Sequence, residues 1–231
     1  GGRRTESTGR AASPARPPRT TVDAVTSALL TDLYELTMLE AARDAGTASR
    51  RCVFEVFTRS LPAGRRYGVL AGTGRVLDAI ADFRFDDADL RYLASTGALR
   101  EDTLDHLAQY EFTGDVFGYQ EGELFFPNSP VLRIEGTFEN AVMLETVVLS
   151  ILNHDSGVAS VGSRMVTAAR GRPLIEMGGR RVHEDAAIAA ARSAYLVGFA
   201  STSNLAAGAH YRVPVAGTPA HALSLPFHTG E

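Results

Sequence analysis

A histidine near the C-terminal end of the sequence follows a run of four small residues. The stretch reads PVAGTPAHALSL, and in it Gly217, Thr218, Pro219 and Ala220 lead directly into His221. Small side chains let other groups approach the backbone closely, so two interpretations are open. Either the loop is simply tight, or a bulky charged group has to lie against it.

Two arginines follow a pair of glycines in the segment EMGGRR. Gly178 and Gly179 stand at the end of a predicted strand, where they free the backbone to approach a ligand, and Arg180 and Arg181 come next. The guanidinium group presents a fork of donors that matches a carboxylate or a phosphate. The alternative is a pair of surface arginines in salt bridges, which composition alone would favour.

A run of neutral hydrogen-bond donors follows the next helical segment. Ser201, Thr202, Ser203 and Asn204 are predicted to open a helix, where free backbone N–H groups favour anions. The alternative is an ordinary N-cap. Two anion-compatible strand ends in one strand–helix array favour an anion-binding site more strongly than either of them alone.

Three other motifs are predicted to have structural roles only. AGTGRVLD lacks the third glycine of a dinucleotide-binding fingerprint and is interpreted as a turn. The triplets NHD at 153–155 and HED at 183–185 lack metal-ligand spacing. We expect a solvated or hydrogen-bonded kink at the first triplet, a helix start at the second, and no metal site.

Hydrophobic periodicity and Gly/Pro punctuation predict helices and strands in a mixed order. A helix with Thr31 as its N-cap ends at Gly46, and a strand ends at Pro62. Further along we expect a helix after the AGTG turn, two short acidic helices in 86–110, three strands in 111–138, a long helix over 139–169, and then a strand at 173–177, helices at 183–198 and 203–210 and a strand at 213–216. The last four elements are typical of a parallel sheet or barrel, whose sites lie at the C-terminal ends of the strands. The fold class predicted is α/β.

Composition excludes several classes of protein. The chain has 231 residues, 45% of them hydrophobic, which is enough for a core. A net charge of −4 argues against a nucleic-acid partner, and no apolar run is long enough to predict a membrane span. A single cysteine, Cys52, fits a reducing compartment, so the predicted location is cytoplasmic.

The predicted organisation has three parts. Residues 1–20 contain five Arg and one Glu with almost no large apolar side chains, so residues 1–27 are expected to form a disordered leader. An N-terminal α/β domain is expected over 28–138, and the first units of a barrel over 139–231. The chain is interpreted as a piece of a longer protein.

Seven segments occur in a consistent order from about Ala28 to the end of the chain. They are TDLYELTM, FEVFTRSLPAGRRYGVLAG, EGELFFPNSPVLRIEG, LETVVLSILNHDS, RPLIEMGGRR, GFASTSNLAAG and VAGTPAHA. Together they closely resemble nicotinate phosphoribosyltransferase in its bacterial form. The resemblance implies an N-terminal α/β domain packed on an irregular type II phosphoribosyltransferase barrel, of which only the first strand–helix units are present.

The resemblance also implies a reaction. Nicotinate would displace pyrophosphate from phosphoribosyl pyrophosphate to give nicotinate mononucleotide, an entry step of NAD salvage. ATP hydrolysis would be coupled to the reaction and Mg²⁺ would accompany the pyrophosphate. The enzyme would be a homodimer whose active sites take residues from both subunits.

Matched position by position, the resemblance implies roles for six residues. His221 would be phosphorylated by ATP, because a neutral imidazole nitrogen is nucleophilic near pH 7. Thr218 would contact nicotinate, and Tyr34 would stack on its ring from the neighbouring subunit; the alternative for Tyr34 is packing on its own core. Arg180 would hold the carboxylate, helped by Ser201 or Ser203.

The chain departs from the family in lacking its second half. The acidic residues around the ribose and the phosphate-binding loops are not in the sequence, so we expect residues 1–231 alone to be inactive. Two alternatives stay open: a phosphoribosyltransferase that uses nicotinamide or quinolinate, and a catalytically dead chain that dimerises with full-length partners.

Overall fold

The computed structural model describes residues 27–219 of the 231-residue chain. His221 and nearly all of the predicted leader lie outside the described residues. No helix of the described part is long and apolar enough to cross a membrane.

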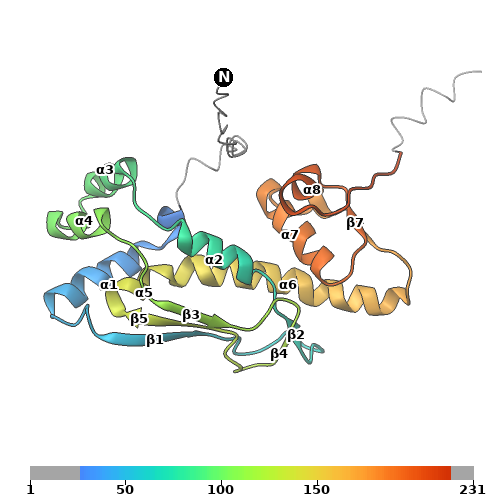
Figure 1. Cartoon of the computed structure of the whole chain (residues 1–231), viewed down its shortest axis with the longest axis horizontal. Helices are drawn as coiled ribbons and strands as arrows, with labels where there is room; N and C mark the ends of the chain where they lie inside the picture. The colour runs from blue at the N-terminus through green and yellow to red at the C-terminus, as the bar shows by residue number, and fades with distance from the viewer. Residues whose placement is uncertain (1–26, 220–231) are drawn as a thin grey trace, which may run out of the picture.

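The N-terminal part is built on a three-stranded antiparallel sheet in the order β1-β5-β3 (Figure 1). The strands are β1 (Arg51–Val56), β3 (Asp115–Gly118) and β5 (Leu132–Thr137), with Val56 opposite Leu132. Phe54 packs against the core while Val53, next in the chain, is 55% exposed. This alternation is the period-2 pattern of a strand that buries one face. The strand occurs where the sequence predicts one, but it ends at Val56 instead of at Pro62.

Helices lie on one side of the sheet and complete its core (Figure 1). The helix α1 (Leu33–Asp44) follows a short 3₁₀ turn, η2 (Ser27–Leu30), and packs against residues 138–144, which follow β5. The helices α2 (Thr73–Ala81), α3 (Asp87–Thr96) and α4 (Glu101–Ala108) occur where the sequence predicts one helix and then two acidic ones. A second, two-stranded sheet pairs β2 (Gly68–Val69) with β4 (Leu124–Phe125).

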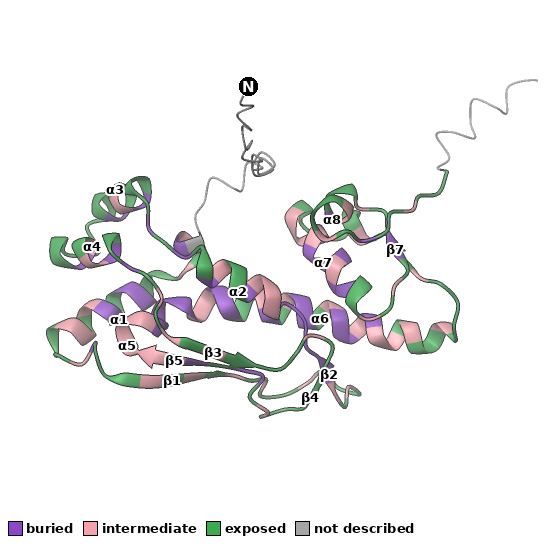
Figure 2. Ribbon diagram, in the orientation of Figure 1, coloured by how far each residue is buried: buried purple, intermediate pink, exposed green. Residues whose placement is uncertain are grey.

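The long helix α6 (Glu145–Ala169) runs through the whole molecule (Figure 1). It is preceded by α5 (Phe138–Ala141) and the 3₁₀ turn η3 (Val142–Leu144), so the predicted helix over 139–169 is divided into three segments. The N-terminal half of α6 packs against the sheets and α2, and its C-terminal half packs against α7 (Glu184–Leu196). Buried residues therefore occur along much of its length, as Figure 2 shows.

The C-terminal part contains parallel strand pairs, as the sequence predicts. The strand β6 (Ile175–Glu176) pairs in parallel with β7 (Ser201–Thr202), and Thr202 forms a parallel bridge with Val215. Between them lie the 3₁₀ turn η4 (Gly178–Arg180) and α7, and α8 (Leu205–Tyr211) follows β7. The result is a mixed helix and sheet fold.

Four further details of the prediction are wrong. The residues Ser201 and Thr202 form β7 instead of opening a helix, and only Asn204 caps α8, by accepting from the Ala207 N–H at 2.9 Å. The strand predicted over 213–216 is reduced to the single bridge at Val215.

The other two concern helix geometry. The N-cap of α1 is Asp32, because the Thr31 hydroxyl instead donates to the Met143 carbonyl at 3.0 Å. The helix α6 continues through 153–155 without the expected kink.

Two serines of α6 fasten β2 to the helix. The Ser156 hydroxyl accepts from the Ala71 N–H and donates to the Ala71 carbonyl, both at 3.1 Å, and the Ser160 Oγ accepts from the Val69 N–H at 2.8 Å. All of these groups are buried. A strand of two residues has few ladder hydrogen bonds, so these side-chain contacts hold it in place.

We predict that Ser156→Ala lowers the free energy of unfolding by about 1–3 kcal/mol, because both polar groups of Ala71 lose a buried partner. The measurement is urea unfolding followed by circular dichroism. Ser150→Ala is the matched control, since Ser150 is exposed on the same helix and its loss should change stability by less than about 0.5 kcal/mol. Equal effects of the two substitutions would contradict the role given to Ser156.

Candidate active-site edge and the charged junction beside it

The EMGGRR segment is held by the carboxylate that precedes it. One oxygen of Glu176 accepts from the Gly178 N–H, and the other accepts from the Thr202 hydroxyl at 2.7 Å. A Cβ on Gly178 would lie 2.8 Å from that first oxygen, so a larger residue there would require the Glu176 side chain to shift. This arrangement fixes η4 and leaves Arg180 exposed at its end.

The parallel pairing brings several predicted site residues to one edge. Because Glu176 lies opposite Thr202 and Thr202 bridges Val215, the C-terminal ends of all three segments point the same way. Arg180, Ser203 and Thr218 each follow one of these ends, and all three are exposed. Ser201 lies within β7 and is only 9% exposed.

Tyr34 lies at the other end of the molecule. It stands in the first turn of α1, is 45% exposed, and lies beside Glu145 and Thr146 at the start of α6. Desolvation, a hydrogen bond to Glu145 and the charge of that carboxylate raise the pKa of the Tyr34 phenol above its ordinary value. The ring is therefore neutral and accessible at physiological pH.

The length of α6 separates Tyr34 from Arg180 within one chain. A Cβ on Gly162 would lie 2.9 Å from Val197, which places the segment leading into β7 beside Gly162. At 1.5 Å per residue, the helix from Thr146 to Gly162 spans about 24 Å. Figure 1 shows α1 and β7 on opposite sides of the midpoint of this helix. The structure brings Arg180, Ser203 and Thr218 to one edge and leaves Tyr34 away from it.

Glu35, next to Tyr34, fixes the start of α6. Its side chain is fully buried, and one carboxylate oxygen accepts from the Thr146 N–H at 2.9 Å and from the Thr146 hydroxyl at 2.5 Å. The N-cap residue of α6, Leu144, makes no side-chain cap, so Glu35 satisfies an N–H that the helix itself leaves free. Desolvation raises the pKa of Glu35, which favours its neutral form.

A charged junction that the sequence analysis missed joins the two parts of the molecule. The carboxylate of Glu121 receives two hydrogen bonds from Arg192 of α7, at 2.9 and 2.6 Å, and one from the Gly72 N–H at 2.6 Å. Although burial alone would raise it, these donors hold the pKa of Glu121 below its usual value. The sequence offered one indication of this junction: Arg192 is the single charged residue in the Ala-rich stretch AAIAAARSAYL.

The same junction explains the AGTG motif. Gly72 is the N-cap of α2 with φ of +99°, and a Cβ there would lie 3.1 Å from Asp155, so the position requires glycine. The Gly72 N–H, which could otherwise donate to a phosphate, donates to the carboxylate of Glu121. The motif is therefore a turn capped by a protein carboxylate, which confirms the sequence interpretation.

A second ion pair lies beside the first. Asp155, fully buried on α6, accepts from Arg75 of α2 at 2.8 and 3.0 Å and lies 3.0 Å from His154 Nδ1. His183 caps α7, as predicted, with its ring nitrogen 3.4 Å from the Asp185 N–H. No group of three or more His, Cys, Asp or Glu side chains within 27–219 is placed to hold a metal ion.

The fold and this edge define a class: an α/β protein in which an antiparallel N-terminal domain precedes parallel strand–helix units with guanidinium and hydroxyl groups at their strand ends. A sequence model of the nicotinate phosphoribosyltransferase (NAPRTase) N-terminal domain matches residues 29–153, more than half of the chain. The chain belongs to the nicotinate phosphoribosyltransferase family.

Individual relatives agree with this assignment. Over 197 residues the chain is 58% identical to nicotinate phosphoribosyltransferase pncB1 of Mycobacterium tuberculosis (strain ATCC 25618 / H37Rv), covering 85% of this chain and 44% of that one. It is 38% identical to nicotinate phosphoribosyltransferase of Bacillus subtilis (strain 168), covering 84% of this chain and 40% of the relative.

Solved structures give the same result for the fold. A crystal structure of human nicotinic acid phosphoribosyltransferase superposes with a TM-score of 0.77 at 35% identity, covering 85% of this chain and 40% of that one. Nicotinate-nucleotide pyrophosphorylase from Pyrococcus furiosus, at 24% identity and a TM-score of 0.71, shares the fold. The chain thus spans less than half the length of these relatives.

Proposed function

We propose that this chain is part of an enzyme that joins nicotinate to phosphoribosyl pyrophosphate, giving nicotinate mononucleotide and pyrophosphate in NAD salvage. The observation that carries the proposal is the 58% identity to a relative named for this activity, over 85% of the chain. Activity is proposed for a protein of the relatives' length, and residues 1–231 alone are proposed to be inactive. The ribose and pyrophosphate contacts are expected outside this sequence.

The exposed edge beyond β6 and β7 suits a pyridine carboxylate. Arg180 offers a bidentate donor for the carboxylate, and Ser201 or Ser203 adds a neutral hydroxyl. An acidic residue in place of Ser203 would repel a carboxylate and favour an amide. These groups therefore favour nicotinate over nicotinamide, which is the second candidate substrate, and over quinolinate, whose extra carboxylate would need a further cation.

Tyr34 is proposed to reach the site from a second copy of the chain. Its separation from the β7 region along α6, about 24 Å, is far beyond the length of a tyrosine side chain. An aromatic ring with a polar edge is suited to stacking on a pyridine. A homodimer that shares its active sites would combine Tyr34 of one subunit with Arg180 of the other, and a catalytically dead chain that only dimerises remains the non-enzymatic alternative.

His221 is proposed to accept a phosphoryl group from ATP. A neutral imidazole nitrogen is a competent nucleophile near pH 7, and the small residues before it leave room for the phosphate. Thr218, exposed in the same motif, is proposed to contact nicotinate. Mg²⁺ would bind mainly through the oxygens of ATP and pyrophosphate, because Mg²⁺ commonly takes few protein ligands.

The proposed location is the cytoplasm. Cys52 is a free thiol in the structure, which fits a reducing compartment. The proposed partners are nicotinate, phosphoribosyl pyrophosphate and ATP, with no nucleic acid and no membrane.

We predict that the protein at the relatives' length turns over nicotinate at least about 100-fold more efficiently than nicotinamide, because only the acid satisfies Arg180. Ser203→Asp should reduce this preference about tenfold or more through repulsion of the carboxylate. The measurement is kcat/KM for both substrates. Ser150→Asp, on the exposed face of α6, is the charge-matched control. Equal use of the two substrates by the unsubstituted protein would contradict the assignment.

We also predict that incubation with ATP labelled on its γ-phosphate transfers acid-labile label to the protein. Label should be absent from His221→Ala and present in His210→Ala, whose histidine is in α8 and is not part of the GTPAH motif. Phosphate bound to a histidine nitrogen is lost in acid, which distinguishes it from phosphoserine. Unchanged labelling of His221→Ala would remove the proposed role of this residue.

A further inference from the structure

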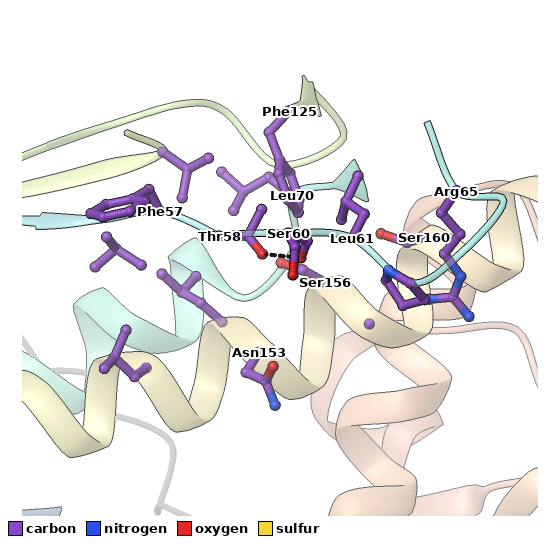
Figure 3. A pocket seen from close by; sticks show the side chains of 16 residues that line it. Phe57, Thr58, Ser60, Leu61, Arg65, Leu70, Phe125, Asn153, Ser156 and Ser160 are labelled. Atoms are coloured by element: carbon purple, nitrogen blue, oxygen red, sulfur yellow. Dashed lines mark hydrogen bonds between the residues drawn. The ribbon is translucent and has the colours of Figure 1, made fainter. Parts of the chain in front are cut away.

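A pocket of about 470 Å³ lies between α6 and residues 57–65, the segment that follows β1 (Figure 3). Its volume falls in the range of small-molecule sites, roughly 300–1,000 Å³. It shares no lining residue with the β6–β7 edge or with Tyr34. The pocket is therefore separate from the groups proposed to bind nicotinate.

Most of the lining is apolar. Side chains from four different parts of the fold line it, which include Leu61, Leu70, Phe125, Leu149 and Leu152. Three of these, Leu70, Phe125 and Leu152, are buried in the main core. Such walls favour an occupant with an apolar body, one ring or a short chain in size.

Arg65 is the one charged residue among those that line the pocket. Figure 3 places it at one end, with Phe57 at the other. The chain pairs Arg75 with Asp155 and Arg192 with Glu121, but Arg65 has no acidic partner among residues 27–219. Since Arg65 is partly buried, an anion bound there would gain a charge-assisted hydrogen bond from a group that is now unpaired.

Gly157, in the interior of α6, lines the pocket where α6 forms its floor. Glycine destabilises a helix interior relative to alanine, so its presence there calls for a reason. At Gly162 on the same helix the reason is packing, since a Cβ would lie 2.9 Å from Val197. At Gly157 a Cβ would meet nothing within 4 Å. The space beside Gly157 is therefore open, and only a side chain larger than alanine would be expected to fill it.

We propose that this pocket binds a small organic monoanion. Its carboxylate or phosphate would lie against Arg65 and its ring or short chain would lie among the leucines above Gly157. The site is additional to the proposed nicotinate site.

The test uses benzoate as the probe and benzamide as its neutral, equally sized control. Dissociation constants are measured by ligand-observed NMR in the absence of ATP and phosphoribosyl pyrophosphate, so that the result is independent of catalysis. We expect saturable binding of benzoate, at least about tenfold tighter than benzamide, because only the anion pairs with the guanidinium.

Two substitutions test separately the charge of Arg65 and the free volume beside Gly157. Arg65→Gln should weaken benzoate about tenfold or more and abolish its preference over benzamide. Gly157→Leu should weaken both compounds about tenfold or more by filling the floor. Gly157→Ala is the matched control: it should fold as the unsubstituted chain does and keep the preference for benzoate.

Arg180→Gln distinguishes this pocket from the proposed nicotinate site. Benzoate binding that survives Arg180→Gln and is lost in Arg65→Gln supports the inference. The inference is wrong if Arg180→Gln removes binding while Arg65→Gln does not, if benzoate and benzamide bind equally, or if Gly157→Leu binds both compounds unchanged. It is also wrong if benzoate does not bind. A change in the sedimentation coefficient of Arg65→Gln would then indicate that a second copy of the chain occupies the pocket.

Discussion

The helix α6 sets the distances on which the rest of this structure depends. Its hydrogen-bonded backbone cannot shorten or fold back, so whatever is fastened to its two ends stays apart. At the N-terminal end, the buried carboxylate of Glu35 accepts from Thr146 and so holds the neighbouring Tyr34 in one place. At the C-terminal half, α7 and the parallel strands carry Arg180 and Ser203. The length of α6 therefore keeps Tyr34 apart from Arg180 and Ser203 within one chain.

The junction between the two parts combines charged pairs with a small apolar cluster, in which Val197 packs against Val69, Ala71 and Ala159. Glu121 and Arg192 form a two-bond pair, and Asp155 with Arg75 forms another on the other side of the α2 N-terminus. Pairs of this kind, once desolvated, add little net stability but are costly to break, so they favour one relative placement of α2, α6 and α7 over others. The left-handed backbone at Gly72 lets these groups meet.

Much of the fold could be predicted because its signals are local. The signals are the alternation over β1, the glycines at helix ends and the acidic first turns of helices. Each can be recognised within a stretch of about ten residues, and the structure agrees with them. The strand at Ser201–Thr202 could not be found, because two residues have no periodicity and hydroxyl side chains favour caps equally well. Thr31 was wrongly predicted to be an N-cap because its hydroxyl donates to the carbonyl of Met143, a partner far away in the sequence.

The candidate site could be predicted only in part. The motif residues at the strand ends could be proposed from the sequence because glycines and arginines stand together there. The partners that hold them were not, since Glu176 meets Thr202 and Glu121 meets Arg192 only after the chain has folded. The pocket above Gly157 has no sequence signature either, because its walls come from separate elements.

The central claim is that one chain cannot complete the site, since α6 holds Tyr34 away from Arg180. The most direct test co-expresses two inactive versions of the protein at the relatives' length, one with Tyr34→Ala and one with Arg180→Ala. A shared site predicts that the mixture regains about a quarter of the unsubstituted turnover, because half of the dimers are mixed and each of these has one intact site. A mixture as inactive as either parent, with mixed dimers present, would contradict the account.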